Sequence, residues 1–175
     1  MIRICFCGSQ RFHREMDDFI AAFRAVARGR EVVCFDPEFK RRPEGFEELP
    51  EKERIRDMLY RAEIPGLVYN HLFRKVIPSD FVFVMNVNGY VGMNTVGEIF
   101  GAAALSKTII ALEPRFLAGA YPHDLHEEPS IRPFVHACCA TPEALCRYVF
   151  NMDEGSSDLS PDTARAHERM QSVAT

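Results

Sequence analysis

Short apolar runs alternate along the chain with longer stretches in which apolar residues recur at helical spacing. The short runs predict strands, and the spacing of three or four residues predicts amphipathic helices. Strands are expected at residues 2–7, 31–35, 81–85, 108–112 and 134–139. Helices are expected at residues 12–28, about 50–61, 68–76 and 95–106, and from 141 onward. This alternation predicts an α/β domain with a parallel sheet, because right-handed crossovers place helices on both faces.

Two loops of unusual composition follow the first and third predicted strands. They are residues 8–11 and residues 86–94. In parallel sheets, ligands bind beyond the carboxyl ends of the strands, where the strand order reverses. If the order is 2-1-3-4-5, that point lies between these two strands, so we expect the binding site there.

Length and composition restrict the classes of protein that fit. The 175 residues predict one α/β domain at 1–150 and a polar tail at 151–175, in which 161–171 is a helix candidate. A net charge of -4 argues against duplex nucleic acid as a partner. No apolar run is long enough to span a bilayer, and the six cysteines suit a reducing compartment, so we expect no membrane partner and a cytoplasmic location.

The first loop, Gly8-Ser9-Gln10-Arg11, has groups that suit an anion. It offers backbone N–H groups, a hydroxyl and a guanidinium at the start of a helix, which is a favourable place for a phosphate. A simpler interpretation is that Gly8 permits the turn and Ser9 caps the helix.

The second loop leads into a helix that carries Glu98. The spacing from Thr95 to Glu98 is that of a capping box, which explains the carboxylate without catalysis. Alternatively, Glu98 lies in the first helical turn, is kept ionised by the helix dipole and acts as a nucleophile facing the cleft. Tyr90 either stacks on a base or sugar or anchors the loop to the core.

Other polar residues have simpler interpretations. Asp80 is either a turn residue or a polar group near the cleft, and His71 and Lys75 are expected to face solvent. Cys5 and Cys7 share one strand face and are expected to pack as small hydrophobic residues, without the spacing of a zinc site. We therefore expect no metal and no cofactor. The charged segment 38–63 is expected to be a solvated excursion or a lid.

Three ordered motifs resemble one known family. They are Cys7-Gly8-Ser9-Gln10-Arg11-Phe12, the segment from His71 to Asn86 that ends in Asp80-Phe-Val-Phe-Val-Met-Asn86, and Gly89-Tyr90-Val91-Gly92-Met93-Asn94-Thr95-Val96-Gly97-Glu98-Ile99. Together they resemble the nucleoside 2-deoxyribosyltransferase-like superfamily, in particular a branch that begins with Cys-Gly-Ser-x-Arg-Phe. The likeness spans roughly residues 2–112 and is weaker over 134–150.

The resemblance implies a flavodoxin-like, Rossmann-like doubly wound sheet of five parallel strands and cleavage of an N-glycosidic bond in a nucleotide or nucleoside. Glu98 would attack the anomeric carbon, and Gly8, Ser9 and Arg11 would receive a 5'-phosphate, as in the related nucleoside 5'-monophosphate N-glycosidases. The substrate contacts would come from Gly8, Ser9, Gln10, Arg11, Asp80, Asn86, Asn88, Gly89, Tyr90, Asn94 and Thr95. A homodimer or larger homo-oligomer is also implied.

One departure from the family concerns the carboxylate that helps protonate the leaving base. Transferases carry an Asp shortly before the nucleophile, where this chain has Gly92-Met93-Asn94. Hydrolysis is therefore favoured over transfer to a second base. Asp80, Asn86, Asn88 or the charged segment would have to supply the proton. The alternative is a non-catalytic nucleotide-binding or sensing module in which Glu98 only caps its helix.

Overall fold

The five-stranded parallel sheet predicted from the sequence is present in the computed structural model, which describes residues 1–40 and 42–150. Its strands are β1 (Ile2–Gly8), β2 (Val32–Phe35), β3 (Phe81–Met85), β4 (Thr108–Ala111) and β7 (Ala137–Cys138). Their order is β2-β1-β3-β4-β7, with every neighbouring pair parallel. The protein is therefore an α/β domain with a flavodoxin-like sheet, and the order reverses between β1 and β3 as expected.

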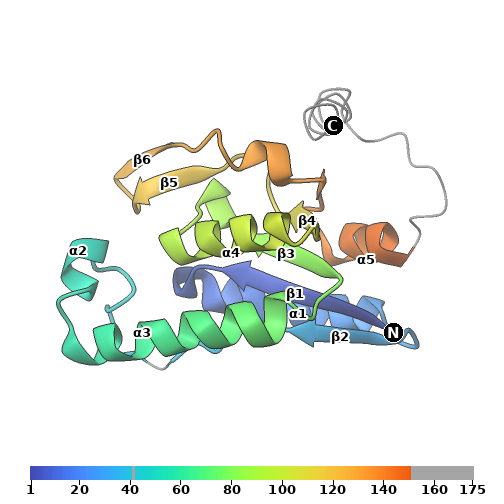
Figure 1. Ribbon diagram of the computed structural model, residues 1–175, viewed down its shortest axis with the longest axis horizontal. Helices are drawn as coiled ribbons and strands as arrows, with labels where there is room; N and C mark the ends of the chain where they lie inside the picture. The colour runs from blue at the N-terminus through green and yellow to red at the C-terminus, as the bar shows by residue number, and fades with distance from the viewer. Residues whose placement is uncertain (41, 151–175) are drawn as a thin grey trace.

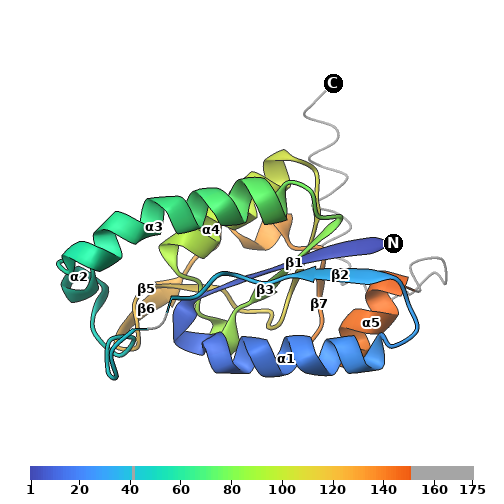
Figure 2. The same ribbon diagram turned by 90° about the horizontal axis from the view of Figure 1, so that it is seen from below.

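Helices cover both faces of this sheet (Figure 2). Helices α1 (His13–Val26) and α5 (Pro142–Phe150) lie on one face and contact each other. Helix α3 (Met58–His71), the π-turn η2 (Leu72–Val76) and α4 (Met93–Ala104) lie on the other. A sheet that is covered twice requires strands that are apolar on both sides, which explains the uninterrupted apolar sequence of β3.

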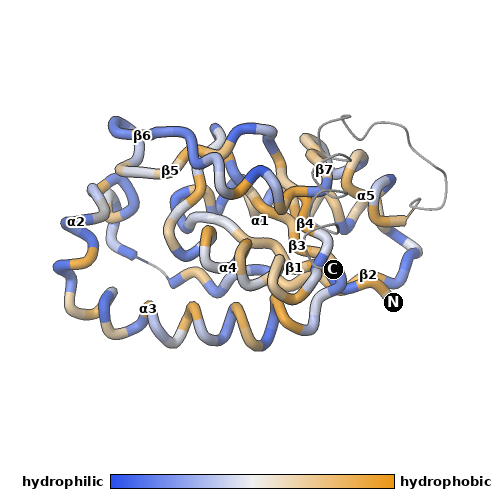
Figure 3. Tube along the Cα trace, turned by 45° about the horizontal axis from the view of Figure 1, so that its top comes forward, coloured by the Kyte–Doolittle hydropathy of each residue, from blue (hydrophilic) through white to orange (hydrophobic). Residues whose placement is uncertain are grey.

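Alternate residues of β1 enter two separate cores. Phe6 packs against rings of Phe19 and Phe23 on α1 and of Phe83 on β3. Cys5 and Cys7 point to the opposite face, into the core formed with α4 and η2. The sequence placed both cysteines on one strand face, and the structure agrees. The central strands form the most hydrophobic part of the chain (Figure 3).

Short helical turns and a hairpin complete the described fold. The turns are η1 (Gln10–Phe12), α2 (Glu51–Arg54), η3 (Val87–Gly89) and η4 (Arg132–Phe134). Strands β5 (Leu117–Ala120) and β6 (Asp124–Glu127) form an antiparallel hairpin. The hairpin and α2 lie at the end of the molecule toward which β1 runs (Figure 1).

Several predicted boundaries are wrong. The third helix begins at Met58 instead of about residue 68, and the fifth strand of the sheet is restricted to Ala137–Cys138. The β5–β6 hairpin lies between the fourth and fifth predicted strands, where the sequence predicted neither a strand nor a helix. None of the helices in the described part of the chain is long and apolar enough to cross a membrane. The predicted tail at 151–175, with its helix candidate, lies outside the described residues.

Candidate active site

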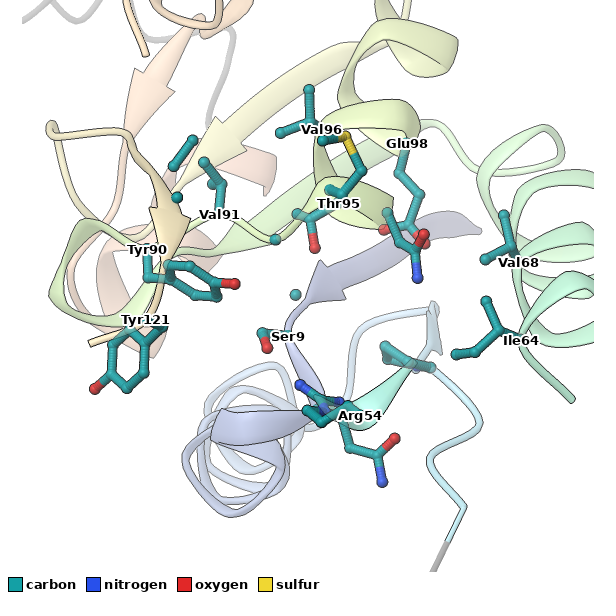
Figure 4. Close-up of a pocket in the computed structure, with 18 of the residues that line it drawn as sticks. Ser9, Arg54, Ile64, Val68, Tyr90, Val91, Thr95, Val96, Glu98 and Tyr121 are labelled. Atoms are coloured by element: carbon teal, nitrogen blue, oxygen red, sulfur yellow. The ribbon is translucent and has the colours of Figure 1, made fainter. Parts of the chain in front are cut away.

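A cleft of about 830 Å³ opens beyond the carboxyl ends of β1 and β3. The two loops that the sequence singled out contribute to it, together with α3, the β5–β6 hairpin and the charged segment. The first loop contributes Ser9 and the second contributes Tyr90. Helix α3 contributes Ile64, the hairpin contributes Tyr121, and the charged segment contributes Arg54. Figure 4 shows Glu98 and the Tyr90 hydroxyl directed into the cavity, with Ser9 and Arg54 across from Glu98.

Glu98 enters the cleft from α4, although not in the way the sequence suggested. The helix is capped by Gly92 without a side-chain hydrogen bond, and no acidic residue lies in its first turn. Thr95 is the third residue of the helix, so the capping-box interpretation is wrong. The helix dipole is felt mainly in the first turn, so it does not keep Glu98 ionised.

Burial dominates the electrostatics of Glu98. Glu98 is only 8% exposed, and this burial raises the pKa of its carboxyl to about 7. The charge of His71 acts in the opposite direction and lowers the pKa of Glu98. The expectation of a carboxylate ionised by the helix end is therefore corrected. Near neutral pH both protonation states of Glu98 are populated, which suits a group that must change charge during a reaction.

His71 is a site residue that the sequence analysis misplaced. It is buried, and its Nε2 lies 3.8 Å from Oε1 of Glu98, 3.5 Å from Sγ of Cys5 and 3.4 Å from Sγ of Cys7. The prediction of a solvent-facing side chain assumed that His71 and Lys75 share the face of a regular helix. The Lys75 side chain is only 15% exposed and donates to the carbonyl of Asp36 after β2, so the face that carries both residues lies against the strands and not toward solvent.

The two thiols behind His71 have pKa values shifted in opposite directions. Hydrogen bonding to Cys7 is the main cause that lowers the pKa of Cys5 to about 6, and His71 adds to it. The same contact and burial raise the pKa of Cys7 well above its usual range. Burial acts to lower the pKa of His71, but the thiol and Glu98 outweigh it and raise the value. Cys5, Cys7, His71 and Glu98 thus form one compact cluster in which the groups shift the pKa values of their neighbours.

The first loop contributes Gly8, Ser9 and Gln10 to the cleft. The Ser9 hydroxyl accepts the N–H of Arg11 at 3.3 Å and so caps η1, as the simpler interpretation held. Gln10 donates to the carbonyl of Lys40 at 2.6 Å. Arg11 does not line the cleft, because its guanidinium donates to the carbonyl of Leu49 at 2.9 Å and lies over the Tyr121 ring.

In the second loop, only part of the predicted contact set lines the cleft. Tyr90, Asn94 and Thr95 do so, together with Gly92 and Met93. Tyr90 is also buried, with its ring 5.0 Å from that of Tyr121, so it is at once an anchor and a wall. Gly89 has φ of 76° and its Cα faces Arg115 and Leu117 rather than the cavity.

Two predicted contact residues support this loop instead. The Asn86 amide donates to the carbonyls of Glu113 and Arg115 at 3.0 and 2.7 Å and accepts the N–H of Glu113 at 3.0 Å. Asn88 is exposed in a left-handed conformation, and its N–H donates to the Glu113 carboxylate. Neither residue lines the cleft. Asn86 therefore fastens β3 to the loop after β4.

Asp80 lies at the opposite end of β3 from the cleft. Its carboxylate accepts the backbone N–H of Arg3 at 2.8 Å and lies 3.8 Å from that residue's guanidinium. Of the two interpretations offered by the sequence, the turn residue is the one observed. Asp80 is placed too far along the sheet to assist a substrate in the cleft.

Arg54 is a cleft residue that the sequence analysis did not select. It is buried between the rings of Phe46 and Tyr60 and lies 2.9 Å from the Glu47 carboxylate. The charged segment that carries it was expected to be a solvated excursion or a lid, and it does line the cleft. The three aromatic residues of this polar segment, Phe39, Phe46 and Tyr60, were the available signal, because such rings are expected to pack against the domain and not to extend into solvent.

No protein-family model matches this chain, and neither does any curated protein or solved structure. The site itself therefore carries the functional argument. It combines a buried carboxyl, an adjacent imidazole, two tilted tyrosine rings in contact and a buried guanidinium at the switch point of a parallel sheet, which is where this class of fold binds small molecules.

Proposed function

We propose that the protein cleaves the N-glycosidic bond of a nucleoside 5'-monophosphate or nucleoside, with Glu98 as the nucleophile and water as the final acceptor. The observation that carries the proposal is the position of Glu98, a buried carboxyl that lines the cleft at the strand-order reversal. A carboxylate there can stabilise an oxocarbenium-like centre and divide one difficult displacement into two easier ones.

The reaction would proceed in two balanced steps. An oxygen of the Glu98 carboxylate forms a bond to the anomeric carbon while the C–N bond breaks, and the base leaves with the electron pair and takes up a proton. Water then attacks the same carbon, releases the carboxylate and loses a proton to solvent. His71, 3.8 Å from Glu98, favours the ionised carboxyl before attack and after release.

The walls of the cleft suit the parts of a nucleotide. Tyr90 and Tyr121 form an aromatic corner that can stack on a base, with ring centroids 5.0 Å apart. Ser9 offers a hydroxyl, and Arg54 offers a guanidinium of the kind that binds phosphate. Because Arg11 is turned toward Leu49, we assign the phosphate contact to Ser9 and Arg54.

The proton for the leaving base has fewer sources than the sequence allowed. Asp80, Asn86 and Asn88 do not line the cleft, whereas the charged segment does, through Glu38, Lys52 and Arg54. The structure thus favours the charged segment among the sources considered. Its closure over the cleft would also exclude water from the bond that breaks.

A non-catalytic nucleotide-binding module is the second candidate. The contact of Glu98 with buried His71 favours it, because the carboxyl already has a structural partner. Both candidates predict that a nucleotide binds. Turnover distinguishes them, since a binding module would release no base.

We further propose that the protein forms a homo-oligomer in the cytoplasm. The free cysteines suit a reducing compartment. Tyr69 and Phe73 are stacked, exposed side chains on the outer surface of α3 and η2, with Leu59 and Ile77 also exposed along the same helical segment. Apolar residues gathered in this way on a surface are typical of an interface.

The test is to incubate the purified protein, in the presence of a metal chelator, with ribo- and deoxyribonucleoside 5'-monophosphates and with the free nucleosides, and to measure released base by chromatography. We expect release that Glu98→Gln abolishes while nucleotide binding persists. Glu127→Gln is the matched control, because Glu127 is exposed on β6 and does not line the cleft. Binding without release from any substrate would favour the sensing module.

A further inference from the structure

The cluster behind Glu98 has a composition that glycosidic chemistry does not require. The Sγ atoms of Cys5 and Cys7 and a ring nitrogen of His71 lie within 4.8 Å of one another, and all three residues are buried. Among the described residues this is the one group of three or more metal-ligating side chains that converge so closely. The two thiols come from β1 and the imidazole from the end of α3, so the sheet and a packed helix fix their positions.

The two distances from the His71 nitrogen to the sulfur atoms match the corresponding edges of a tetrahedron around zinc. With zinc at about 2.3 Å from sulfur and about 2.0 Å from nitrogen, tetrahedral ligands lie about 3.5 Å apart. Nε2 of His71 is 3.4 Å from Sγ of Cys7 and 3.5 Å from Sγ of Cys5. The three donors could thus bind one ion with little movement of the backbone.

Hydrogen bonding alone leaves the cluster incompletely satisfied. Both thiols approach the same nitrogen, which has either one hydrogen or one lone pair to offer. A metal ion would use both sulfur atoms and Nε2 at once, whereas a set of neutral hydrogen bonds cannot.

Glu98 provides a fourth ligand and the cleft provides access. Its Oε1 lies 3.8 Å from Nε2, and the corresponding edge of a zinc tetrahedron is about 3.3 Å, so a small rotation of the carboxylate closes the site. His71 and Glu98 line the cleft, while the cysteines lie behind them. An ion can therefore enter from the cleft side.

We propose that Cys5, Cys7, His71 and Glu98 form a tetrahedral site for one zinc ion. Two thiolates and an imidazole favour zinc over magnesium or calcium, which prefer oxygen ligands. This inference goes beyond the proposed function and does not depend on it. If Glu98 is also the nucleophile, zinc occupies its lone pairs, and the metal-bound protein is the inactive form of the enzyme.

The site predicts a metal-binding measurement that needs no substrate. The full chain is reduced, stripped with a chelator and titrated with zinc against a chromophoric competitor, and separately with Co²⁺ as a spectroscopic probe. We expect one ion per chain, tetrahedral Co²⁺ bands and thiolate-to-cobalt charge transfer. Cys5→Ser and Cys7→Ser are each expected to weaken zinc binding at least about 100-fold, because each removes a ligand directly bound to the ion.

Matched variants separate the site from general effects on the fold. Cys34→Ser removes a half-buried thiol outside the cluster and is expected to leave zinc binding unchanged. Glu98→Gln retains both thiols, so it is expected to weaken binding and keep the charge-transfer band. Circular dichroism of each variant verifies that it is folded.

Several results would overturn the proposal. One is the binding of fewer than one tightly bound ion per chain, and another is a Co²⁺ spectrum without thiolate bands. The third is the loss of the charge-transfer band in both Glu98→Gln and Cys34→Ser. If no base is released in the glycosidase assay, the zinc titration still tests the metal site. If no zinc binds, the glycosidase assay still tests the proposed function.

Discussion

Nε2 of His71 lies 3.8 Å from Oε1 of Glu98, and this contact joins the two helices that cover one face of the sheet. His71 ends α3, which forms a wall of the cleft, while Glu98 projects from α4. The contact gives the buried carboxyl a polar partner, and both side chains line the cleft.

His71 is expected to act as a positioning residue in this arrangement. In metal-stripped protein, His71→Gln should lower kcat for base release by about tenfold or more, equivalent to about 1.4 kcal/mol, with little change in KM. A neutral amide neither favours the ionised carboxyl nor holds it at the same place. His126→Gln, on the exposed surface of β6, is the control. An unchanged kcat would show that the contact has only a structural role.

Arg54, rather than Arg11, is expected to recognise a phosphate. Arg54→Gln should raise KM for a nucleoside 5'-monophosphate about tenfold or more and leave KM for the free nucleoside nearly unchanged, because a charge-assisted hydrogen bond contributes roughly 1.5–3 kcal/mol. Arg11→Gln is the matched control, since this guanidinium donates to Leu49 outside the cleft. Steady-state kinetics on both substrates measures the difference. The reverse pattern would assign the phosphate to Arg11.

Asn86 is expected to matter for stability more than for binding. Its buried amide makes three hydrogen bonds to the backbone of half-buried Glu113 and exposed Arg115, so Asn86→Ala removes all three and leaves a space at a buried position. We expect a loss of about 1–3 kcal/mol in the free energy of unfolding, measured by denaturant titration. Asn88→Gly should change it by less than about 0.5 kcal/mol, since glycine readily adopts the left-handed conformation that Asn88 has there.

The sheet could be predicted from the sequence because its signal is local. Residues 81–85 are all apolar, and such a run is expected where a strand is covered on both faces. The two loops were singled out by their composition and by an assumed strand order that the sheet does have, and both contribute to the cleft. Glu98, Ser9 and Tyr90 were selected in this way.

The rest of the site depends on contacts between distant segments. The apolar residues of α3 are distributed around the helix instead of along one side, so helical periodicity did not reveal its start. The contact of His71 with Cys5 spans 66 positions in the chain. Arg54 was missed because its neighbours Phe46 and Tyr60 bury it only after the charged segment folds back.

Gly8 is expected to be required for packing at the cleft floor. A Cβ on Gly8 would lie 2.6 Å from Cε of Met16 and 3.1 Å from Cβ of Met85. Met16 can move its flexible end, but Met85 is fixed in β3, so Gly8→Ala should destabilise the protein by about 1–3 kcal/mol. Gly66→Ala, in α3 with open space around it, should instead stabilise it by about 0.5–1 kcal/mol. Thermal unfolding of both variants tests the difference, and a neutral Gly8→Ala would contradict it.

The exposed pair Tyr69 and Phe73 is expected to lie in an interface between copies of this chain. Their rings stack 4.5 Å apart and remain about half exposed, so the surface they share would be covered in an oligomer. Tyr69→Asp places a charge in that interface and should shift the protein to monomers, as measured by light scattering after size-exclusion chromatography, because a buried unpaired charge is strongly unfavourable. Ala21→Asp, on the exposed side of α1 across the sheet, adds the same charge and should leave the assembly intact. A wild-type protein that is monomeric at all concentrations would refute the interface, whereas an oligomer that survives Tyr69→Asp would move it away from α3.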